Sequence, residues 1–472
     1  MSYLTRLLSS SDSEQQNFPD LTAFNRFDSQ RYPYLLLSSA TKQNNTQFDI
    51  LIACPQSTLT LNADKTLSYD ALNNQSNVSI DSGSGFFNNL EKLYQQDKQS
   101  YNSKDNLPFT GGWFVYLAYE MAEEIEPRLS LPALSDKQPL AVAARCPAAI
   151  IIDKKNNQCL AVAETDYVYL LDEIEQDYKH LVNKVEDSQT ELIVDEQIEL
   201  ESLIESDKSL YLSQVEKIKQ YIVEGDIFQA NLSRQWHASL QQTVDDAALI
   251  KALAKNNPSS FAAMACMQNM TIISSSPERL VSLKNGIVET RPIAGTRPRA
   301  DNQENDEALA KELLAHPKEQ AEHIMLIDLE RNDLGRVCRP GSIEVNELMT
   351  LESWQHVHHI VSNVRGELES DKSPIDVLRA VFPGGTITGC PKVRCMEILA
   401  ELEQQARGAY TGSLGYINRD GSMDFNILIR TMVREGNKIT FRAGGGIVND
   451  SVAEKELEET RAKAKGLLKI FK

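Results

Sequence analysis

Two pairs of glutamates with the same spacing are the first sign of chemistry in this chain. Glu319 and Glu322 are three residues apart, and so are Glu456 and Glu459. On a helix, residues three apart share one face, so each pair would present two carboxylates together. Magnesium prefers such oxygen ligands. Glutamate is also common on solvated helix faces, so only convergence of the two pairs would make a metal site.

Two glycine-rich segments offer backbone N–H groups. Gly444–Gly446 precede the second glutamate pair and are expected between a strand and a helix, where the positive helix end favours an anionic ligand. Residues 383–392 read Pro-Gly-Gly-Thr-Ile-Thr-Gly-Cys-Pro-Lys. This resembles a phosphate-binding P-loop, but Lys392 arrives two positions late and no Ser or Thr follows it. We expect this decapeptide to contact something small and anionic other than ATP.

Single side chains add an acid, a base and a cation. Glu278 follows a predicted strand at a proline turn, where a fixed acid could protonate a leaving hydroxyl. Arg430 interrupts an apolar run, and its partner could be a substrate carboxylate or a structural salt bridge. The segment 356–359 contains three histidines, but neighbours on a strand point to opposite faces. One histidine moving a proton is therefore favoured over zinc.

The elements that must position these side chains differ between the two halves of the chain. Short apolar or β-branched runs in the first half predict strands at 34–38, 48–53, 111–116, 148–153 and 159–163. The second half predicts strands at 227–235, 270–276, 357–364, 409–416, 424–433 and 438–443. It also predicts an amphipathic helix at 212–222, one long helix at 305–330, and a terminal helix capped by Ser451 and Glu454.

Composition limits the class of protein. The 472 residues carry a net charge of −19, which argues against a nucleic-acid or anionic membrane partner. Seven cysteines without a Cys-x-x-Cys pair fit a reducing compartment. The chain has neither an apolar run of membrane-spanning length nor an N-terminal secretion signal, so we expect a cytoplasmic protein.

An acidic segment divides the chain. We expect a β-rich region at 1–170, an acidic linker at 171–208 and a catalytic region at 209–472, together forming an α+β fold.

Six segments taken in order resemble the chorismate-utilising enzyme family. They are residues 225–233, 276–279, 290–296, 327–335, 383–392 and 443–448. Weaker similarity at 34–61 and 107–119 points to the amination branch, which comprises component I of anthranilate synthase and of aminodeoxychorismate synthase. The resemblance implies a large two-layer β-sandwich core surrounded by helices.

Individual residues distinguish the branches of the family. In family members that add water to chorismate, a lysine general base occupies the position of Gln229, whereas ammonia users resemble this chain and have glutamine there. Asn231, the wording of 384–389 and the three glycines resemble aminodeoxychorismate synthases. Ala294 instead resembles anthranilate synthases, because the other group has a lysine there that is held to attack ring C2. Aminodeoxychorismate synthase is the favoured interpretation and anthranilate synthase the alternative.

The resemblance also implies roles. Glu278 would protonate the departing C4 hydroxyl, and His359 would flank the ring beside Gln229 and Ala294. Mg²⁺ would be held by Glu322 and Glu459, with Glu319 and Glu456 in or near its shell. Residues implied to bind chorismate are Asn231, Thr386, Tyr410, Arg430, Gly445, Gly446 and Lys463.

Ammonia must arrive unprotonated, and nothing in the chain resembles a glutamine amidotransferase. The resemblance therefore implies a separate glutaminase subunit, component II. Related proteins can hold tryptophan in the N-terminal region, where this chain reads Leu-Leu-Leu-Ser-Ser at 35–39. The wording of feedback-regulated members is missing, so we expect weak feedback or none. Two remoter alternatives are a nucleotide-binding module and a non-catalytic amino-acid-binding regulator.

Overall fold

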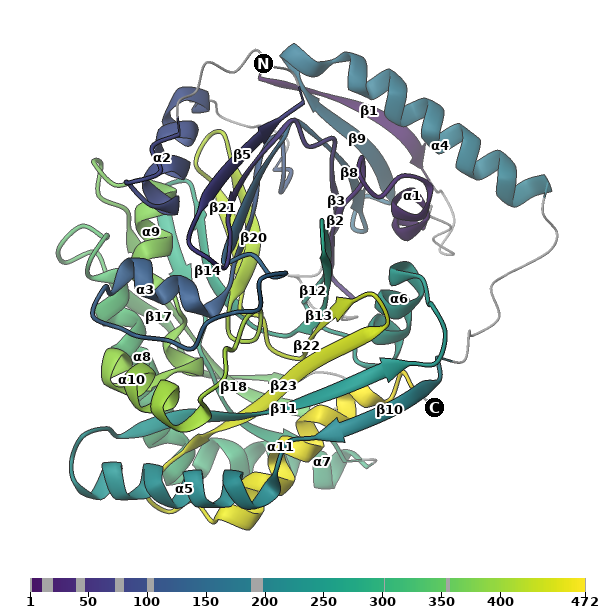
Figure 1. Cartoon of the computed structure of the whole chain (residues 1–472). Coiled ribbons are helices and arrows are strands. Elements are labelled where there is room, and N and C mark those ends of the chain that lie inside the picture. Colours follow the sequence, from purple (N-terminus) through teal and green to yellow (C-terminus); the bar gives the residue numbers. More distant parts are fainter. Residues whose placement is uncertain are drawn as a thin grey trace.

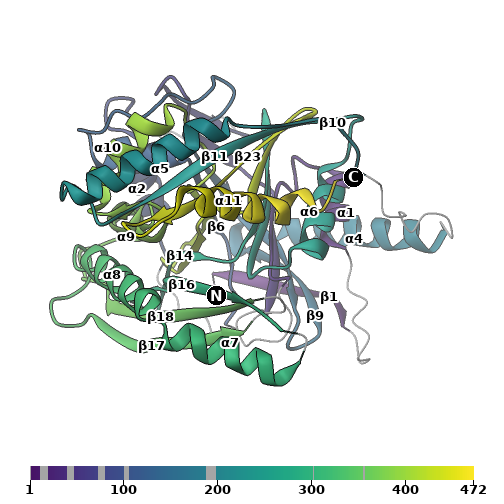
Figure 2. The same ribbon diagram turned by 90° about the horizontal axis from the view of Figure 1, so that it is seen from below.

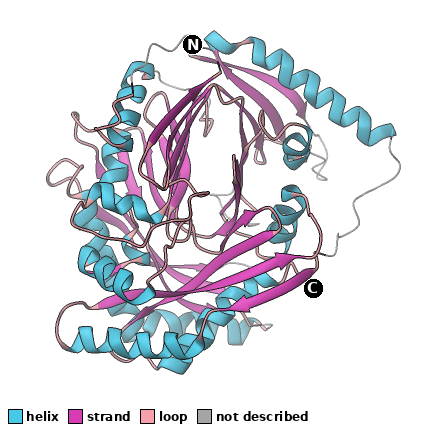
Figure 3. Cartoon of the chain, in the orientation of Figure 1, coloured by secondary structure: helices cyan, strands magenta, loops and turns pink. Residues whose placement is uncertain are grey.

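Two large antiparallel β-sheets form the centre of the molecule, and helices lie around them (Figures 1 and 3). The structure, a computed structural model, describes residues 2–10, 20–39, 47–72, 80–99, 106–187, 198–300, 302–353 and 357–471. Within these ranges the first sheet has 12 strands and the second has 11. The expected α+β fold with a two-layer sheet core is confirmed.

The first sheet contains strands from both halves of the chain. Its order is β1-β9-β8-β3-β2-β12-β13-β22-β23-β11-β10, with β19 paired to β11. The bounds are β1 Tyr3–Ser10, β2 Tyr34–Leu37, β3 Phe48–Ala53, β8 Ala148–Asp153, β9 Gln158–Glu164, β10 Leu200–Glu205, β11 Gln229–Leu240, β12 Phe261–Met267, β13 Met270–Ser276, β19 Gly389–Cys390, β22 Thr431–Glu435 and β23 Lys438–Ile447.

The second sheet also mixes the two halves. Its order is β16-β18-β15-β14-β21-β20-β6-β7-β4-β5, with β17 paired to β18. The bounds are β4 Ser57–Leu61, β5 Leu67–Ala71, β6 Gly112–Leu117, β7 Ala141–Cys146, β14 Arg279–Lys284, β15 Ile287–Thr290, β16 Ile293–Pro298, β17 Glu344–Ser353, β18 Val357–Glu367, β20 Ser413–Asn418 and β21 Met423–Asn426.

Helices cover the outer faces, and Figure 2 shows α11 running along the underside beside α5. The bounds are α1 Leu21–Phe27, α2 Phe86–Asp97, α3 Ala122–Ile125, α4 Tyr169–Asp187, α5 Lys208–Val223, α6 Asp246–Asn256, α7 Gln303–Ala315, α8 Pro317–Leu334, α9 Pro374–Val381, α10 Lys392–Glu403 and α11 Ala453–Leu468. Short 3₁₀ turns occur at Tyr119–Met121, Thr165–Tyr167 and Gly385–Ile387, the last labelled η3.

The main core lies between the sheets. Tyr34 of the first sheet stacks on Phe114 of the second, with ring centroids 3.7 Å apart. A second apolar cluster fills the outer face of the first sheet, where Phe24, Ile174 and Leu249 bring in α1, α4 and α6. Burial of these side chains on both faces of one sheet holds the N-terminal and C-terminal strands in one framework.

The acidic segment 171–208 contains ordered elements. Most of α4 and all of β10 fall inside it, and only residues 188–197 lie outside the described residues. Because both sheets draw strands from each side of this segment, the division at 171–208 is a division of the sequence rather than of the core.

Two predicted elements were wrong, because the structure has two separate elements in the place of each. The single helix at 305–330 is divided into α7 and α8 at His316, since a residue before proline is pushed to extended backbone and Pro317 begins the next helix. The single strand at 424–433 is divided into β21 and β22, which belong to different sheets. The chain crosses between the sheets at 427–430, where Arg430 has a φ of 51°.

The terminal helix was expected to begin with a capping box, and this was also wrong. Its N-cap is Val452, which makes no side-chain cap. The Ser451 hydroxyl instead accepts a hydrogen bond from the N–H of Val448 at 3.1 Å. Glycines 444–446 likewise lie inside β23, and not between a strand and a helix as expected.

Gly415 provides a test of how closely the second sheet is packed. A Cβ at this position in β20 would lie 2.2 Å from the backbone oxygen of Asp424, so Gly415→Ala forces neighbouring backbone to move. We expect it to lower the free energy of unfolding by about 1–3 kcal/mol, measured by urea denaturation. Gly466→Ala is the matched control. A Cβ there comes no closer than 3.7 Å to Asn257, and alanine favours the helix by about 0.5–1 kcal/mol. Equal effects of the two changes would contradict the packing described.

Candidate active site

The longest strand pair in the first sheet carries one wall of the site. Asn231 of β11 pairs with Gly446 of β23, and Leu232 pairs with Gly445. A Cβ on Gly446 would lie 2.1 Å from Nε2 of Gln229, so a side chain there would have to displace that amide. The ladder therefore brings Gln229, Asn231 and the glycines together.

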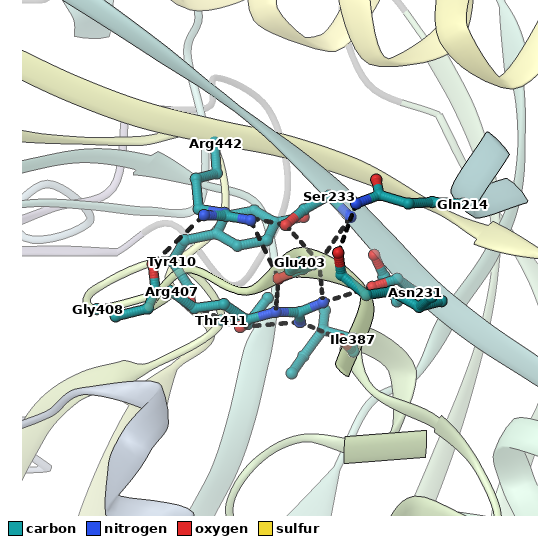
Figure 4. A network of polar contacts seen from close by, with 12 residues as sticks. Gln214, Asn231, Ser233, Ile387, Glu403, Arg407, Gly408, Tyr410, Thr411 and Arg442 are labelled. Atoms are coloured by element: carbon teal, nitrogen blue, oxygen red, sulfur yellow. Dashed lines mark hydrogen bonds and ion pairs between the residues drawn. The ribbon is translucent and has the colours of Figure 1, made fainter. Parts of the chain in front are cut away.

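A buried ionic network holds this wall in place (Figure 4). Glu403, at the end of α10, accepts from Arg407 at 2.7 Å and from Arg442 at 3.0 Å. Arg407 also donates to the backbone oxygen of Asn231 at 2.6 Å, and Ser233 donates its hydroxyl to Glu403 at 2.8 Å. All of these side chains are almost completely buried apart from that of Asn231, so the register of β11 is fixed by charge as well as by the sheet.

The decapeptide 383–392 lies beside the same strand. Asn231 donates its N–H to the oxygen of Thr388 at 2.9 Å, and Cys390 of β19 pairs with Gln229. Lys392 is held by Asp333 at 2.5 Å and by the oxygen of Val381 at 3.2 Å. Its ammonium group is therefore part of an internal ion pair, which removes the feature that resembled a P-loop.

Glu278 is the buried acid of the site. Thr386, in the turn η3, donates its hydroxyl to Oε1 of Glu278 at 2.7 Å. Burial raises the pKa of Glu278 to about 7, against the lowering effects of the Thr386 hydrogen bond and of the charges on Arg430 and Lys463. At neutral pH much of this carboxyl population carries a proton beside two cations.

Lys463 of α11 links the terminal helix to the glycines. Its ammonium group donates to the oxygen of Gly444 at 2.8 Å and pairs with Glu459 at 2.8 Å. A Cβ on Gly445 would lie 3.5 Å from a carboxylate oxygen of both Glu456 and Glu459. This second glutamate pair therefore faces Gly445 together with Lys463.

Tyr410 lies against the same strand. Its hydroxyl would be 2.8 Å from a Cβ on Gly444, and burial raises the pKa of Tyr410 to about 12. The hydroxyl is therefore a neutral hydrogen-bonding group next to the glycines.

His359 and the first glutamate pair form the opposite wall. His359 on β18 contacts the oxygen of Gly295 at 3.3 Å through Nδ1, and burial lowers its pKa to about 4, helped by the charge of Arg430. Buried Ala294 precedes Gly295 on β16. A Cβ on Gly295 would lie 2.8 Å from Glu319 of α8, and Glu322 lies half-buried one turn further along that helix.

The structure thus gathers most predicted residues in one neighbourhood. Glu319 lies beside Gly295, whose backbone oxygen contacts His359. The charge of Arg430 acts on both His359 and Glu278. Glu278 in turn accepts from Thr386 and is affected by the charge of Lys463. Glu322 is placed only by its position on α8. His358 faces away, toward Ser353 and Asp306, and His356 lies outside the described residues.

A bound metal ion needs several ligand atoms close together. Among the described residues, no group of three or more His, Cys, Asp or Glu side chains is arranged to hold one. Magnesium often keeps several waters and takes only one or two carboxylates plus substrate oxygens, and Glu456 with Glu459 at Gly445 fits that mode. Joint binding by all four glutamates stays a prediction.

Two side-chain amide oxygens in the site are available as hydrogen-bond acceptors. In the part of the chain that the structure describes, Oε1 of Gln229 and Oδ1 of Asn231 are buried and accept no hydrogen bond. Buried acceptors left unpaired cost free energy, so a ligand with N–H or O–H groups would stabilise this wall.

Glu278 lines neither of two cavities. A groove of about 860 Å³ is lined by α3, α8, the ends of the decapeptide and the start of α10. A smaller cavity of about 130 Å³ lies at Leu36–Ser38, between the sheets, where Arg279 and Asp424 form a two-bonded ion pair. It occupies the segment expected for tryptophan, which stays a prediction.

Sequence reasoning missed the buried carboxyl of Glu330 and the arginines around Glu403. No role was predicted for Asp333, three residues after Glu330 in the segment 327–335. Glu403 and Arg407 are opposite charges only four residues apart, which was a readable signal although Arg407 lies beyond the end of α10. The contact of Arg442 with Glu403 depends on the fold.

Among the described residues, no helix is long and apolar enough to cross a membrane.

Comparison with known proteins gives consistent matches. The model of a family described as chorismate binding enzyme matches residues 32–469. An anthranilate synthase component I-like protein of Synechocystis sp. is 42% identical over 392 residues, 81% of this chain and 77% of that relative. Aminodeoxychorismate synthase component 1 of Bacillus subtilis is 53% identical over 250 residues, 53% of each chain. The crystal structure of anthranilate synthase component I from Streptococcus pneumoniae has a TM-score of 0.76 and 29% identity, covering 97% of this chain and 100% of that one.

Thr386 provides a test of the charge state of Glu278. A hydrogen bond to the carboxylate favours the charged form, so Thr386→Val should raise the pKa of Glu278 above its value of about 7. Because the pKa of Glu278 exceeds the ordinary 4.5, the stability that its protonated carboxyl contributes is fully present below pH 4.5 and is lost as the pH rises through about 7. The variant should move that loss to higher pH.

The measurement is a carboxyl ¹³C NMR titration, with Glu278→Gln identifying the signal. Thr350→Val, whose hydroxyl donates to the oxygen of Val361, controls for the loss of any threonine hydroxyl. A Glu278 midpoint that stays in place, or falls, in Thr386→Val contradicts the assignment.

Proposed function

Because the chain belongs to the chorismate-binding enzyme family, close to component I of anthranilate synthase and of aminodeoxychorismate synthase, we propose that it aminates chorismate. The proposed product is 4-amino-4-deoxychorismate, the precursor of 4-aminobenzoate in folate biosynthesis. The observation that carries the proposal is the buried acid Glu278, hydrogen-bonded to Thr386 and close to the charges of Arg430 and Lys463.

The cations give chorismate its orientation. Chorismate has two carboxylates, and an anionic substrate would offset the burial of Arg430, whose pKa burial lowers. We assign the enolpyruvyl carboxylate to Arg430, Lys463 and Tyr410, with the N–H groups of Gly445 and Gly446. Thr386 is assigned to the ring carboxylate.

Glu278 supplies the proton for the leaving group. A hydroxide ion leaves carbon slowly, and protonation by a positioned acid typically accelerates such a step by about 10²–10⁴-fold. Burial keeps the Glu278 proton available near neutral pH, where an exposed glutamate would have lost it. His359, with its lowered pKa, is neutral there and flanks the ring without adding positive charge.

The side-chain amides of Gln229 and Asn231 favour ammonia as the nucleophile. The open acceptors on Gln229 and Asn231 can take N–H bonds from ammonia without removing a proton from it. A lysine base at this position would instead activate water. Unprotonated ammonia is scarce at neutral pH, so we propose a separate glutaminase, component II, as its source.

Magnesium is the proposed cofactor, held by Glu459 and Glu322 with Glu456 and Glu319 in or near its shell. Bound there, it would draw electron density from the ring carboxylate of the substrate. The protein residues do the rest: they orient the ring, hold the acid and exclude water.

Anthranilate synthesis is the alternative, and specific observations favour it. The Synechocystis and Streptococcus pneumoniae relatives carry that name, and Ala294 lacks the amine held to attack ring C2 in aminodeoxychorismate synthases. Our hypothesis is that ammonia or water takes that role here. We further propose a cytoplasmic location and weak or absent control by tryptophan.

The product decides between the two reactions. Chorismate, magnesium and an ammonium salt should give a non-fluorescent amino compound that a lyase converts to 4-aminobenzoate. Glu278→Gln should lower kcat by about 10²–10⁴-fold, because it keeps the shape but loses the proton. Fluorescent anthranilate and pyruvate, formed without any lyase, would establish the alternative.

Glu459 tests the metal assignment. Glu459→Gln should raise the magnesium concentration needed for half-maximal activity by about 10–100-fold, since an amide is a weaker ligand than a carboxylate. Glu458→Gln is the control, because Glu458 pairs with Arg461 on the exposed face of α11. Equal magnesium dependence in the two variants would remove Glu459 from the metal site.

A further inference from the structure

Glu278 and Arg430 lie where the chain crosses between the two sheets. Residues 277–278 connect β13 of the first sheet to β14 of the second, and residues 427–430 connect β21 of the second sheet back to β22 of the first. β13 pairs antiparallel with β22 (Figure 1), and β14 pairs antiparallel with β21. The two crossings therefore run side by side in opposite directions, with the acid on one and the cation on the other.

Main-chain hydrogen bonds join the two crossings at both ends. Ile427 donates its N–H to the oxygen of Glu278 at 3.0 Å, and Ser275 donates its N–H to the oxygen of Arg430 at 3.1 Å. The crossings lie outside the named strands, so their other buried polar groups need partners from side chains or neighbouring loops.

Two neighbouring serine hydroxyls supply such partners. Ser276 donates its hydroxyl to the oxygen of Ile427 at 2.5 Å and accepts the N–H of Glu278 at 3.3 Å. Ser275 donates its hydroxyl to the oxygen of Arg430 at 3.3 Å and accepts from the side-chain amide of Asn257 at 2.7 Å. Both serines are completely buried. Each hydroxyl thus contacts the main chain of the crossing that carries Arg430, and that of Ser276 also contacts the main chain of Glu278.

The backbone of Arg430 needs this support. Its φ of 51° lies in the left-handed region, which is unfavourable for any residue with a Cβ and persists only where the surroundings fix it. The oxygen of Arg430 accepts from both the N–H and the hydroxyl of Ser275. Because the backbone angles of a residue set the direction of its side chain, these bonds also direct the guanidinium group. The charge of Arg430 acts on Glu278 and on His359.

We propose that Ser275 and Ser276 are positioning residues that hold the backbone of Arg430 against that of Glu278, so that the cation orients a substrate carboxylate beside the acid. The part that concerns the substrate rests on the proposed function. The arrangement of the two charged side chains exists without substrate and can be measured without turnover.

The first test measures this arrangement through the titration of Glu278. Arg430 and Lys463 lower its pKa through their charges, and Glu330 lies close enough for the charge of Glu278 to act on it. If Ser275 holds Arg430 in place, Ser275→Ala weakens one of the lowering charges, and the pKa of Glu278 should rise above about 7. Carboxyl ¹³C NMR of the protein without substrate records the midpoint.

Arg430→Gln makes this test specific. The single change should raise the Glu278 midpoint, and adding Ser275→Ala to it should raise the midpoint no further, because the charge that Ser275 positions is already gone. A midpoint that stays in place or falls in Ser275→Ala overturns the proposal. A rise of the same size with and without the Arg430 charge overturns it as well.

The second test separates KM from kcat. Ser275→Ala should raise KM for chorismate about 2–10-fold, the effect of one lost hydrogen bond, with kcat changed by less than about twofold. Ser276→Ala should raise KM by a similar factor and also lower kcat, because the N–H of Glu278 loses its acceptor. Ser413→Ala is the matched control, since it removes an equally buried serine hydroxyl that donates to the backbone oxygen of Asn426 at 2.5 Å. A KM in Ser275→Ala no higher than that of the control overturns the role.

Asn257 keeps the proposal testable if Ser275→Ala fails to fold. Asn257→Ala removes the half-buried amide that donates to the Ser275 hydroxyl, and the Glu278 midpoint should move in the same direction by a smaller amount. No movement in that variant overturns the proposal. Failure of wild-type protein to aminate chorismate is a separate result, which would remove the proposed function and leave the NMR comparison to decide the positioning.

Discussion

The carboxylate of Glu403 joins the segments that build the site. Burial opposes its charge, but Arg407 and Arg442 hold its pKa below the usual value. Through them Glu403 connects α10, the turn before Tyr410, and the strands β11 and β23. Removing one partner from such a buried group leaves an uncompensated charge, at a cost of about 3–5 kcal/mol. The register that brings Gln229 to Gly446 depends on this network.

The acid site depends on an opposite arrangement of charge. Glu403 has two arginines in direct contact and stays ionised, whereas Glu278, among the residues that the structure describes, accepts from a threonine hydroxyl and has two cations at longer range. Two buried carboxyls in one protein thus take different protonation states because of their surroundings. A charged carboxylate can hold segments together through ion pairs, whereas a protonated carboxyl can act as a proton donor.

Apolar and β-branched runs report burial directly, and they predicted strands such as β3, β8 and β11. About half of the described strands, among them β4, β7 and β12, were not predicted. Such runs also failed where tertiary context decides: β21 and β22 read as one apolar run, although the chain changes sheet at Arg430. Glu278 and the segment containing Thr386 were singled out from the residues themselves, but only the family resemblance joined them with Lys463 in one site, since more than 70 residues separate each from the next. Arg442 gave no local signal, because its partner Glu403 comes from a distant segment.

The position of the new nitrogen tests the account most directly. Turnover of chorismate with ¹⁵N-ammonium and magnesium, followed by NMR of the isolated product, locates the label on the ring. The account predicts nitrogen on C4 with the enolpyruvyl group retained. Nitrogen on C2 of an aromatic ring, with pyruvate released, would contradict it and make this chain an anthranilate-forming enzyme.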